Sequence, residues 1–89
     1  MNVFFIVNPV AGKGSSLNAI PVIKKYCDKL NIKYAIEKTQ YAGHATKLSR
    51  EAEKLGYSTV VAVGGDGTLL EVANGLIGSS LAFGVIPAG

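Results

Sequence analysis

The chain carries the sequence STVVAVGGDGTLLEVANGL at residues 58–76. Its first part, residues 58–63, is apolar throughout its second half and predicts a buried strand. Residues 64–67 are three glycines around one aspartate and predict a tight turn, and the apolar-rich segment from Thr68 to about Ile77 predicts a helix. A buried strand, a glycine turn and a helix in succession make up most of a βαβ unit, which points to a parallel sheet.

The same alternation continues on both sides of this stretch. The further predicted elements are strands over residues 3–7, 32–38 and 81–86 and helices over residues 17–30 and 44–55. Residues 32–38 alternate between apolar and polar, which favours a place near the sheet edge. Pro21 fits a helix only in its first turn. The sequence therefore predicts the α/β class: a three-layer parallel sheet of βαβ units with right-handed crossovers.

Composition limits the classes of function. Eighty-nine residues with 48% hydrophobic and 17% charged side chains predict one ordered domain. The longest apolar run, residues 3–7, is too short to span a membrane, and no secretory leader is recognisable, so a cytoplasmic protein is expected. The net charge of +3 comes from scattered lysines, which argues against nucleic acid as a partner. The single Cys27 predicts neither a disulfide nor a metal site.

The glycine turn at residues 64–67 has two interpretations. Three glycines before a helix leave backbone N–H groups open to an anion, along the favourable direction of the helix dipole. Asp66 would then hold water bound to Mg²⁺, a lysine or a ribose hydroxyl beside the phosphates. Alternatively the turn is an ordinary connection in which Thr68 or Asp66 caps the helix. The local sequence leaves both interpretations open.

A second candidate is the loop NPVAGKGSS at residues 8–16, which has two glycines, hydroxyl groups and a lysine. It does not fit the Walker A pattern, because Val7 stands where a glycine is needed and Gly14 where a Ser or Thr is needed. It does not fit the dinucleotide fingerprint either, because Leu17 replaces a small residue. By itself the loop is a weak indication of phosphate binding.

Polar residues elsewhere are ambiguous. Glu71 and Asn74 lie three residues apart on one helix face, where they either orient the glycine turn or form the solvated side of the helix; the pattern favours the solvated side. His44 is interpreted as a residue at a helix start rather than as a general base. Thr39 and Gln40 end a predicted strand at the ligand side of the sheet.

Taken in order, these features resemble one family. The shared motifs are Asn8-Pro9 with Gly12 and Gly14, Gly43-His44-Ala45, Gly64 to Thr68 with Glu71, Asn74-Gly75-Leu76, and Gly84 to Gly89. The arrangement resembles the diacylglycerol kinase catalytic domain and extends to bacterial soluble lipid kinases, sphingosine kinases and ceramide kinases. It covers essentially the whole chain. NAD kinases carry a similar glycine turn but would be expected to have an Asn-rich turn after the fourth strand and to lack the Asn8-Pro9 opening.

The resemblance implies the N-terminal nucleotide-binding domain of a diacylglycerol kinase or NAD kinase-like fold, with ATP and Mg²⁺ as cofactors. A lipid hydroxyl would attack the γ-phosphate of Mg-ATP, so that catalysis is mainly positioning and charge neutralisation. Asp66 would bind the metal indirectly, through Mg-ATP. The residues that the resemblance assigns to the nucleotide are Asn8, Pro9, Val10, Ala11, Gly12, Thr39, Gly64, Gly65, Asp66, Gly67, Thr68, Leu69, Leu70 and Glu71.

The resemblance also implies that residues 1–89 are an incomplete domain, because the family continues past Gly89 with a β-rich lipid-binding domain. The family's catalytic base lies there, and no residue of this chain is assigned as catalytic. We therefore expect little activity from these residues alone, membrane contact only in the full-length protein, and self-association through exposed apolar surface. Two alternatives are a freestanding nucleotide-binding or assembly module without catalysis and an enzyme of the NAD kinase type.

Overall fold

A computed structural model describes residues 1–88, so the last residue of the final motif, Gly89, lies outside the described part. The elements are β1 (Asn2–Val7), a 3-10 segment (Ala11–Asn18), α1 (Ala19–Lys29), β2 (Lys33–Lys38), α2 (His44–Lys54), β3 (Thr59–Gly64), α3 (Asp66–Gly75) and β4 (Ala82–Pro87). All four predicted strands and all three predicted helices are present, in the predicted order.

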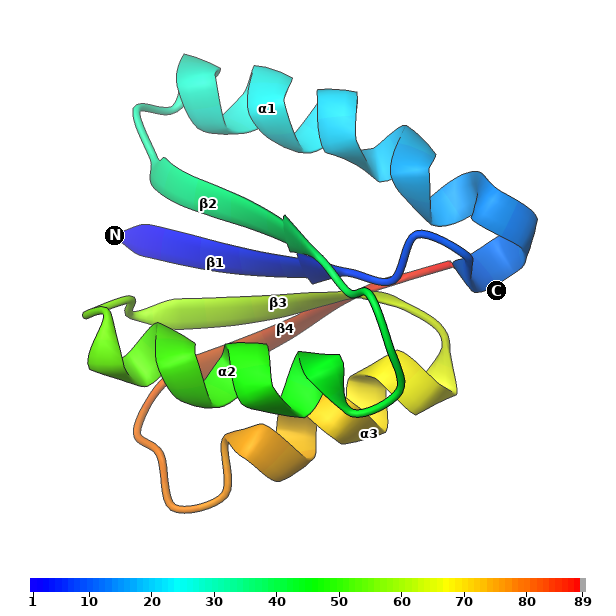
Figure 1. Ribbon diagram of the computed structural model, residues 1–89. Coiled ribbons are helices and arrows are strands. Elements are labelled where there is room, and N and C mark those ends of the chain that lie inside the picture. Colours follow the sequence, from blue (N-terminus) through cyan, green and yellow to red (C-terminus); the bar gives the residue numbers. More distant parts are fainter. Residues whose placement is uncertain (89) are drawn as a thin grey trace.

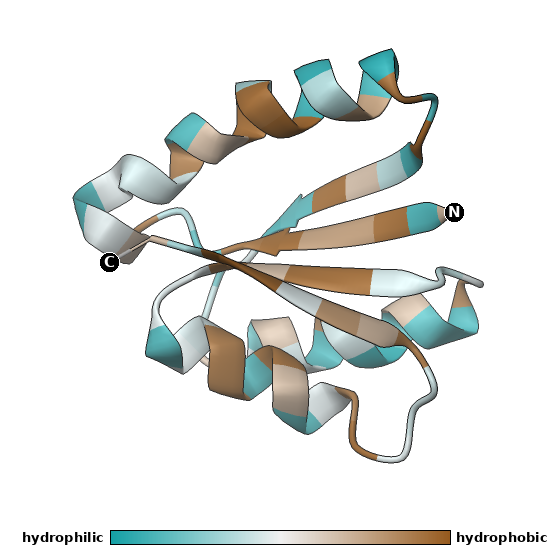
Figure 2. Cartoon of the chain, turned by 180° about the vertical axis from the view of Figure 1, so that it is seen from behind, coloured by the Kyte–Doolittle hydropathy of each residue, from teal (hydrophilic) through white to brown (hydrophobic). Residues whose placement is uncertain are grey.

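The four strands form one parallel sheet in the order β2-β1-β3-β4. Figure 1 shows α1 on one face of this sheet and α2 with α3 on the other, which confirms the predicted three-layer α/β architecture. β1 and β3 lie in the middle and are almost wholly buried, whereas β2 lies at an edge as its alternating pattern predicted. In Figure 2 the middle strands are largely hydrophobic and hydrophilic residues recur along the helices.

Alternate residues of β1 build two separate cores. Phe4 and Ile6 join the cluster beneath α2 and α3, whereas Val3, Phe5 and Val7 join the cluster beneath α1. This division follows from the period of two in a strand, because a strand that is covered on both faces must be apolar at every position. The sheet is thereby fixed between two packed layers, and the ends of its strands are held in register.

Two helix starts differ from the predictions. α1 begins at Ala19, because the preceding residues form 3-10 turns interrupted by left-handed backbone from Gly12 to Gly14. Pro21 is the third residue of α1, so its expected place in the first turn is confirmed. α3 begins at Asp66, two residues before the predicted start at Thr68, because the extended Gly65 takes the N-cap position and the helix starts directly after it.

The two helices on the same face approach each other closely at Gly75. A Cβ at this glycine would lie 1.8 Å from Ser49 Oγ and 2.5 Å from the carbonyl oxygen of Thr46, so only glycine fits the contact. Ser49 is fully buried, and its hydroxyl donates to the Thr46 carbonyl at 2.9 Å. Within residues 1–88, no helix is long and apolar enough to cross a bilayer.

Candidate functional site

The loops that follow β1, β2 and β3 meet at one edge of the sheet because the strands are parallel. Backbone hydrogen bonds connect them beyond the strand ends. The Asn8 N–H donates to the Val63 carbonyl at 3.0 Å, and the Thr39 N–H donates to the Val7 carbonyl at 2.8 Å. The first and second loops are therefore fixed relative to β3 and the glycine turn behind it.

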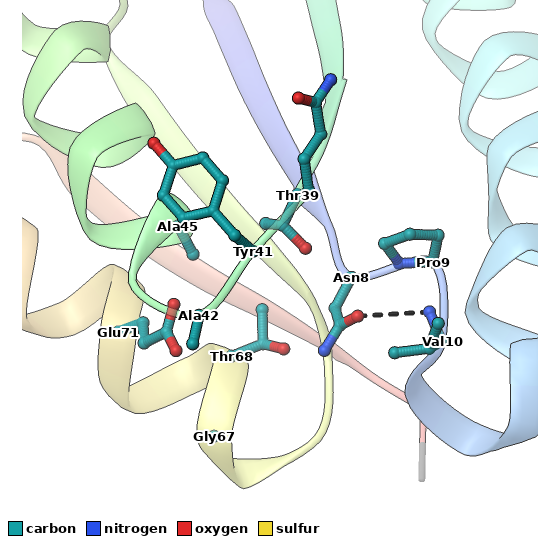
Figure 3. Close-up of a pocket in the computed structure, with 11 residues that line it drawn as sticks. Asn8, Pro9, Val10, Thr39, Tyr41, Ala42, Ala45, Gly67, Thr68 and Glu71 are labelled. Atoms are coloured by element: carbon teal, nitrogen blue, oxygen red, sulfur yellow. Dashed lines mark hydrogen bonds between the residues drawn. The ribbon is translucent and has the colours of Figure 1, made fainter.

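A pocket of about 420 Å³ opens between these loops and the start of α3. Figure 3 shows Pro9 and Val10 on one side, Tyr41 and Ala42 on the opposite side, and Thr68 and Gly67 below. The lining residues are Asn8, Pro9, Val10, Thr39, Gln40, Tyr41, Ala42, Ala45, Gly67, Thr68 and Glu71. We call this the main pocket. Its volume falls within the usual range for small-molecule sites.

The loop after β1 is shaped by Asn8. Its side-chain Oδ1 accepts the Val10 N–H at 3.2 Å, the dashed contact in Figure 3. Its main-chain carbonyl accepts both the Ala11 N–H at 3.2 Å and the buried Ser16 hydroxyl. An asparagine that bonds to the backbone two residues ahead makes a tight turn without a glycine. The turn sends the chain away from β1, and Asn8, Pro9 and Val10 remain at the pocket.

The start of α3 depends on Gly64. A Cβ at Gly64 would lie 2.6 Å from Thr68 Oγ1, so the absence of a side chain lets the buried Thr68 pack against the end of β3. No side chain caps the helix, because its N-cap residue is Gly65. The interpretation of Thr68 or Asp66 as the cap is therefore wrong. The first N–H groups of any helix lack partners within the helix, so an uncapped start leaves donors available to a ligand.

A smaller hollow of about 260 Å³ lies on the other side of the same helix start. Its lining residues are Gly64, Gly65, Asp66, Leu69, Val85, Pro87 and Ala88. Asp66 is exposed and is the first residue of α3. The acidic residue and the main pocket thus lie on different sides of one helix N-terminus.

Glu71 connects α3 to the loop after β2. Its Oε1 accepts the Gly43 N–H at 3.1 Å, and its carbonyl accepts the Thr46 hydroxyl at 2.7 Å. Gly43 has φ of 90°, a left-handed conformation that glycine adopts without strain. Glu71 is therefore more than part of a solvated helix face, and it bonds to this loop rather than to the glycine turn. Asn74 is exposed.

Eleven of the fourteen residues that the resemblance assigns to the nucleotide line one of the two hollows. The main pocket receives Asn8, Pro9, Val10, Thr39, Gly67, Thr68 and Glu71, and the smaller hollow receives Gly64, Gly65, Asp66 and Leu69. Ala11, Gly12 and Leu70 line neither. Leu70 is 68% exposed. That these residues bind nucleotide stays a prediction at this point.

Sequence reasoning did not place Tyr41, Ala42 or Ala45 in the site. The rule that ligands lie beyond the carboxyl ends of parallel strands could have indicated the whole loop after β2, of which only Thr39 and Gln40 were considered. His44 is the first residue of α2, and its Nδ1 accepts the Gln40 N–H at 3.0 Å, which confirms its role at a helix start.

The titratable side chains of residues 1–88 form no cluster of metal ligands. Within the part of the chain that the structure describes, no three His, Cys, Asp or Glu side chains are grouped so as to hold a metal ion. Burial, followed by the nearby charge of Asp28, raises the pKa of the Cys27 thiol. Cys27 belongs to the core beneath α1, on the opposite face of the sheet from α2 and α3, so it takes no part in the pocket.

Comparison with known proteins defines the class. Residues 2–89 match the family described as the diacylglycerol kinase catalytic domain. The chain is 36% identical to a diacylglycerol kinase of Staphylococcus carnosus over 86 residues, covering 94% of this chain and 28% of that protein. It is 34% identical over 91 residues to sphingosine kinase 1 of Arabidopsis thaliana, covering 93% of this chain and 19% of that protein.

A solved structure agrees with the sequence comparison. A diacylglycerol kinase from Bacillus anthracis str. Sterne superimposes with a TM-score of 0.79 at 31% identity, over 99% of this chain and 33% of that one. The fold thus matches that of a diacylglycerol kinase over nearly the whole of this chain. The chain belongs to the diacylglycerol kinase catalytic domain family, and it spans about a third or less of the length of these relatives.

Proposed function

We propose that this chain is the ATP-binding part of a lipid kinase, in which the γ-phosphate of Mg-ATP is transferred to a lipid hydroxyl. The observation that carries the proposal is the convergence of the Asn8 loop, Thr39 and the uncapped start of α3 around one pocket at the carboxyl edge of a parallel sheet. Family membership supports the choice of a lipid kinase over an NAD kinase or a non-catalytic module.

In this proposal the phosphates lie against the start of α3. Gly67 lines the main pocket, and a Cβ at this position would meet nothing within 4 Å, so the backbone here is open to a ligand. Free N–H groups and the positive end of the helix dipole attract an anion. The Asn8 to Val10 turn forms the adjoining wall and confines the phosphate chain.

Asp66 suits an indirect role with Mg²⁺. Magnesium usually binds through one or two carboxylates together with substrate phosphates and water, so a single exposed carboxylate beside a phosphate site is a fitting partner. Bound with ATP, Mg²⁺ neutralises charge on the phosphates. Asp66 would orient the metal-bound nucleotide from the smaller hollow, and Glu71 would keep the loop after β2 in position through Gly43.

The lipid-binding and base functions are proposed for parts of a full-length protein that have no counterpart in these 89 residues. Diacylglycerol or a related lipid as acceptor, peripheral contact with a membrane and a cytoplasmic location all belong to this proposal for the full-length protein. The chain by itself is expected to bind ATP weakly, at about 1 mM, equivalent to about 4 kcal/mol of binding free energy.

Isothermal calorimetry of the 89-residue chain with Mg-ATP tests the proposal. We expect saturable binding that weakens at least about tenfold in Gly67→Val, because the added side chain blocks backbone approach to phosphate. Val is no poorer a helix former than Gly, so folding should be unaffected. Asn74→Ala, at an exposed position of the same helix that lines neither hollow, is the matched control and should bind like the wild type. Absence of binding, or unchanged binding by Gly67→Val, would contradict the proposal.

A further inference from the structure

Tyr41 is an aromatic residue at the wall of the main pocket. It follows β2, lines the pocket and is 56% exposed. In Figure 3 it lies on the opposite side of the pocket from Pro9 and Val10. A side chain that is more than half exposed contributes little to folding by burial and remains accessible to a ligand.

The ring is nevertheless held in place. It stacks on the imidazole of His44 with centroids 4.4 Å apart and planes 14° apart. His44 is itself fixed, because its side-chain Nδ1 accepts the Gln40 backbone N–H at 3.0 Å and its backbone N–H donates to the Tyr41 carbonyl at 3.1 Å. The bond from the Gly43 N–H to Glu71 secures the other end of the loop. Tyr41 is thus a preorganised surface rather than a free side chain.

Tyr41 differs from Tyr57 in that its ring does not pack against a hydrophobic core cluster. Tyr57 packs its ring against Phe4 with centroids 5.0 Å apart and belongs to the core beneath α2 and α3. Tyr41 belongs to neither core cluster. His44 covers one face of its ring, and the high exposure leaves the other available to a planar ligand.

We propose that Tyr41, supported by His44, is the subsite on which the base of the nucleotide stacks. This inference rests on the proposed function, because it needs the phosphates at Gly67 and the Asn8 turn. A nucleotide in that orientation extends across the main pocket toward the opposite wall, where Tyr41 lies. Thr39 and Gln40, which precede Tyr41 and also line the pocket, would contact the ribose and the edge of the base.

Stacking on Tyr41 predicts how strongly nucleotides with different bases bind. Every base has a π face, and stacking on an aromatic side chain depends on ring area more than on hydrogen-bonding edges. ATP and GTP should therefore bind with similar affinity, and UTP, with its single ring, should bind several-fold more weakly.

Calorimetry with two titrants separates the base subsite from the phosphate site. Mg-ATP and Mg-tripolyphosphate, which lacks the base and the sugar, are titrated into wild type, Tyr41→Ala and Tyr41→Phe. We expect Tyr41→Ala to bind Mg-ATP about tenfold more weakly and tripolyphosphate unchanged, because stacking is commonly worth about this much. Tyr41→Phe keeps the ring and should bind both like the wild type. Tyr26→Ala removes a similarly exposed tyrosine, 53% exposed on α1, and should change neither.

The outcomes identify which idea fails. Equal ATP affinity in Tyr41→Ala and wild type, with both binding, overturns the base subsite and leaves the proposed function intact. An equal loss of ATP and tripolyphosphate binding in Tyr41→Ala also overturns it, since the residue would then act on the whole pocket. If wild type binds neither titrant, the proposed function fails and the base subsite fails with it.

Discussion

Asp66 occupies a position where two physical roles compete. As the first residue of α3 it interacts favourably with the helix dipole, which is worth about 0.3–1 kcal/mol for an exposed side chain. In the proposed function it is a carboxylate beside a phosphate site, where it would repel free ATP and attract ATP that carries Mg²⁺. The first role affects only the stability of the fold. In the second role, the charge of Asp66 would weaken the binding of metal-free ATP and strengthen the binding of Mg-ATP.

Asp66→Asn distinguishes these roles. We expect the variant to bind metal-free ATP more tightly than the wild type and Mg-ATP more weakly, because the charge is lost at nearly constant size. Its free energy of unfolding should fall by less than about 1 kcal/mol. Calorimetry with and without Mg²⁺, together with thermal melting, provides the measurements. If the gain in affinity on adding Mg²⁺ is the same in both proteins, Asp66 has no part in binding the metal.

Among the elements, α3 connects the site to the rest of the fold. Its start forms the floor of the main pocket, its middle bonds to Gly43 through Glu71, and its end contacts α2 at Gly75. Displacing one end of a rigid helix moves the other. The contact at Gly75 therefore has a stabilising role and also keeps the helix start in position.

The packing of α3 against α2 can be tested with two glycines of α3, Gly75 and Gly67. Gly75→Ala should lower the free energy of unfolding by about 1–3 kcal/mol or more, because its Cβ would overlap Ser49 and Thr46. Gly67→Ala meets open space and should be neutral or stabilising by up to about 1 kcal/mol. Urea denaturation of both variants is the measurement. Equal stability of the two would show that α2 and α3 do not pack as described.

The elements were the most predictable part of the molecule. The strand at residues 3–7 was recognisable because burial on both faces requires an apolar residue at every position, and that requirement is visible in the sequence. The start of α3 was misplaced because Gly65 is extended whereas Gly67 is helical, a difference that composition does not reveal. Tyr41 was missed because the loop after β2 has no regular period, so the sequence pattern does not reveal that its ring stacks on His44.

For the whole molecule, the outer strand β4 leaves apolar surface open. Phe83 and Val85 are 40% and 44% exposed, and the far edge of β4 has no neighbouring strand among residues 1–88. An unprotected apolar edge strand favours pairing with another chain. We propose that the chain self-associates through this edge.

Sedimentation velocity tests the association. The wild type should show concentration-dependent dimers or larger species, and Phe83→Lys should remain a monomer over the same range, because a charge at an edge strand opposes pairing. Lys33→Ala, on the other edge strand, is the control and should associate like the wild type. A wild-type monomer at high concentration would exclude self-association.

The central claim is that ATP binds at the carboxyl edge of the sheet with its phosphates at the start of α3. The most direct test is to follow the backbone amide signals of the ¹⁵N-labelled chain by NMR as Mg-ATP is added. We expect the largest shifts at Gly65, Gly67 and Thr68, followed by Val10 and Thr39. Little change is expected in the hollow that Arg50 and Ser79 line at another part of the surface. Absence of saturable shifts, or shifts that concentrate around Arg50 and Ser79, would contradict it.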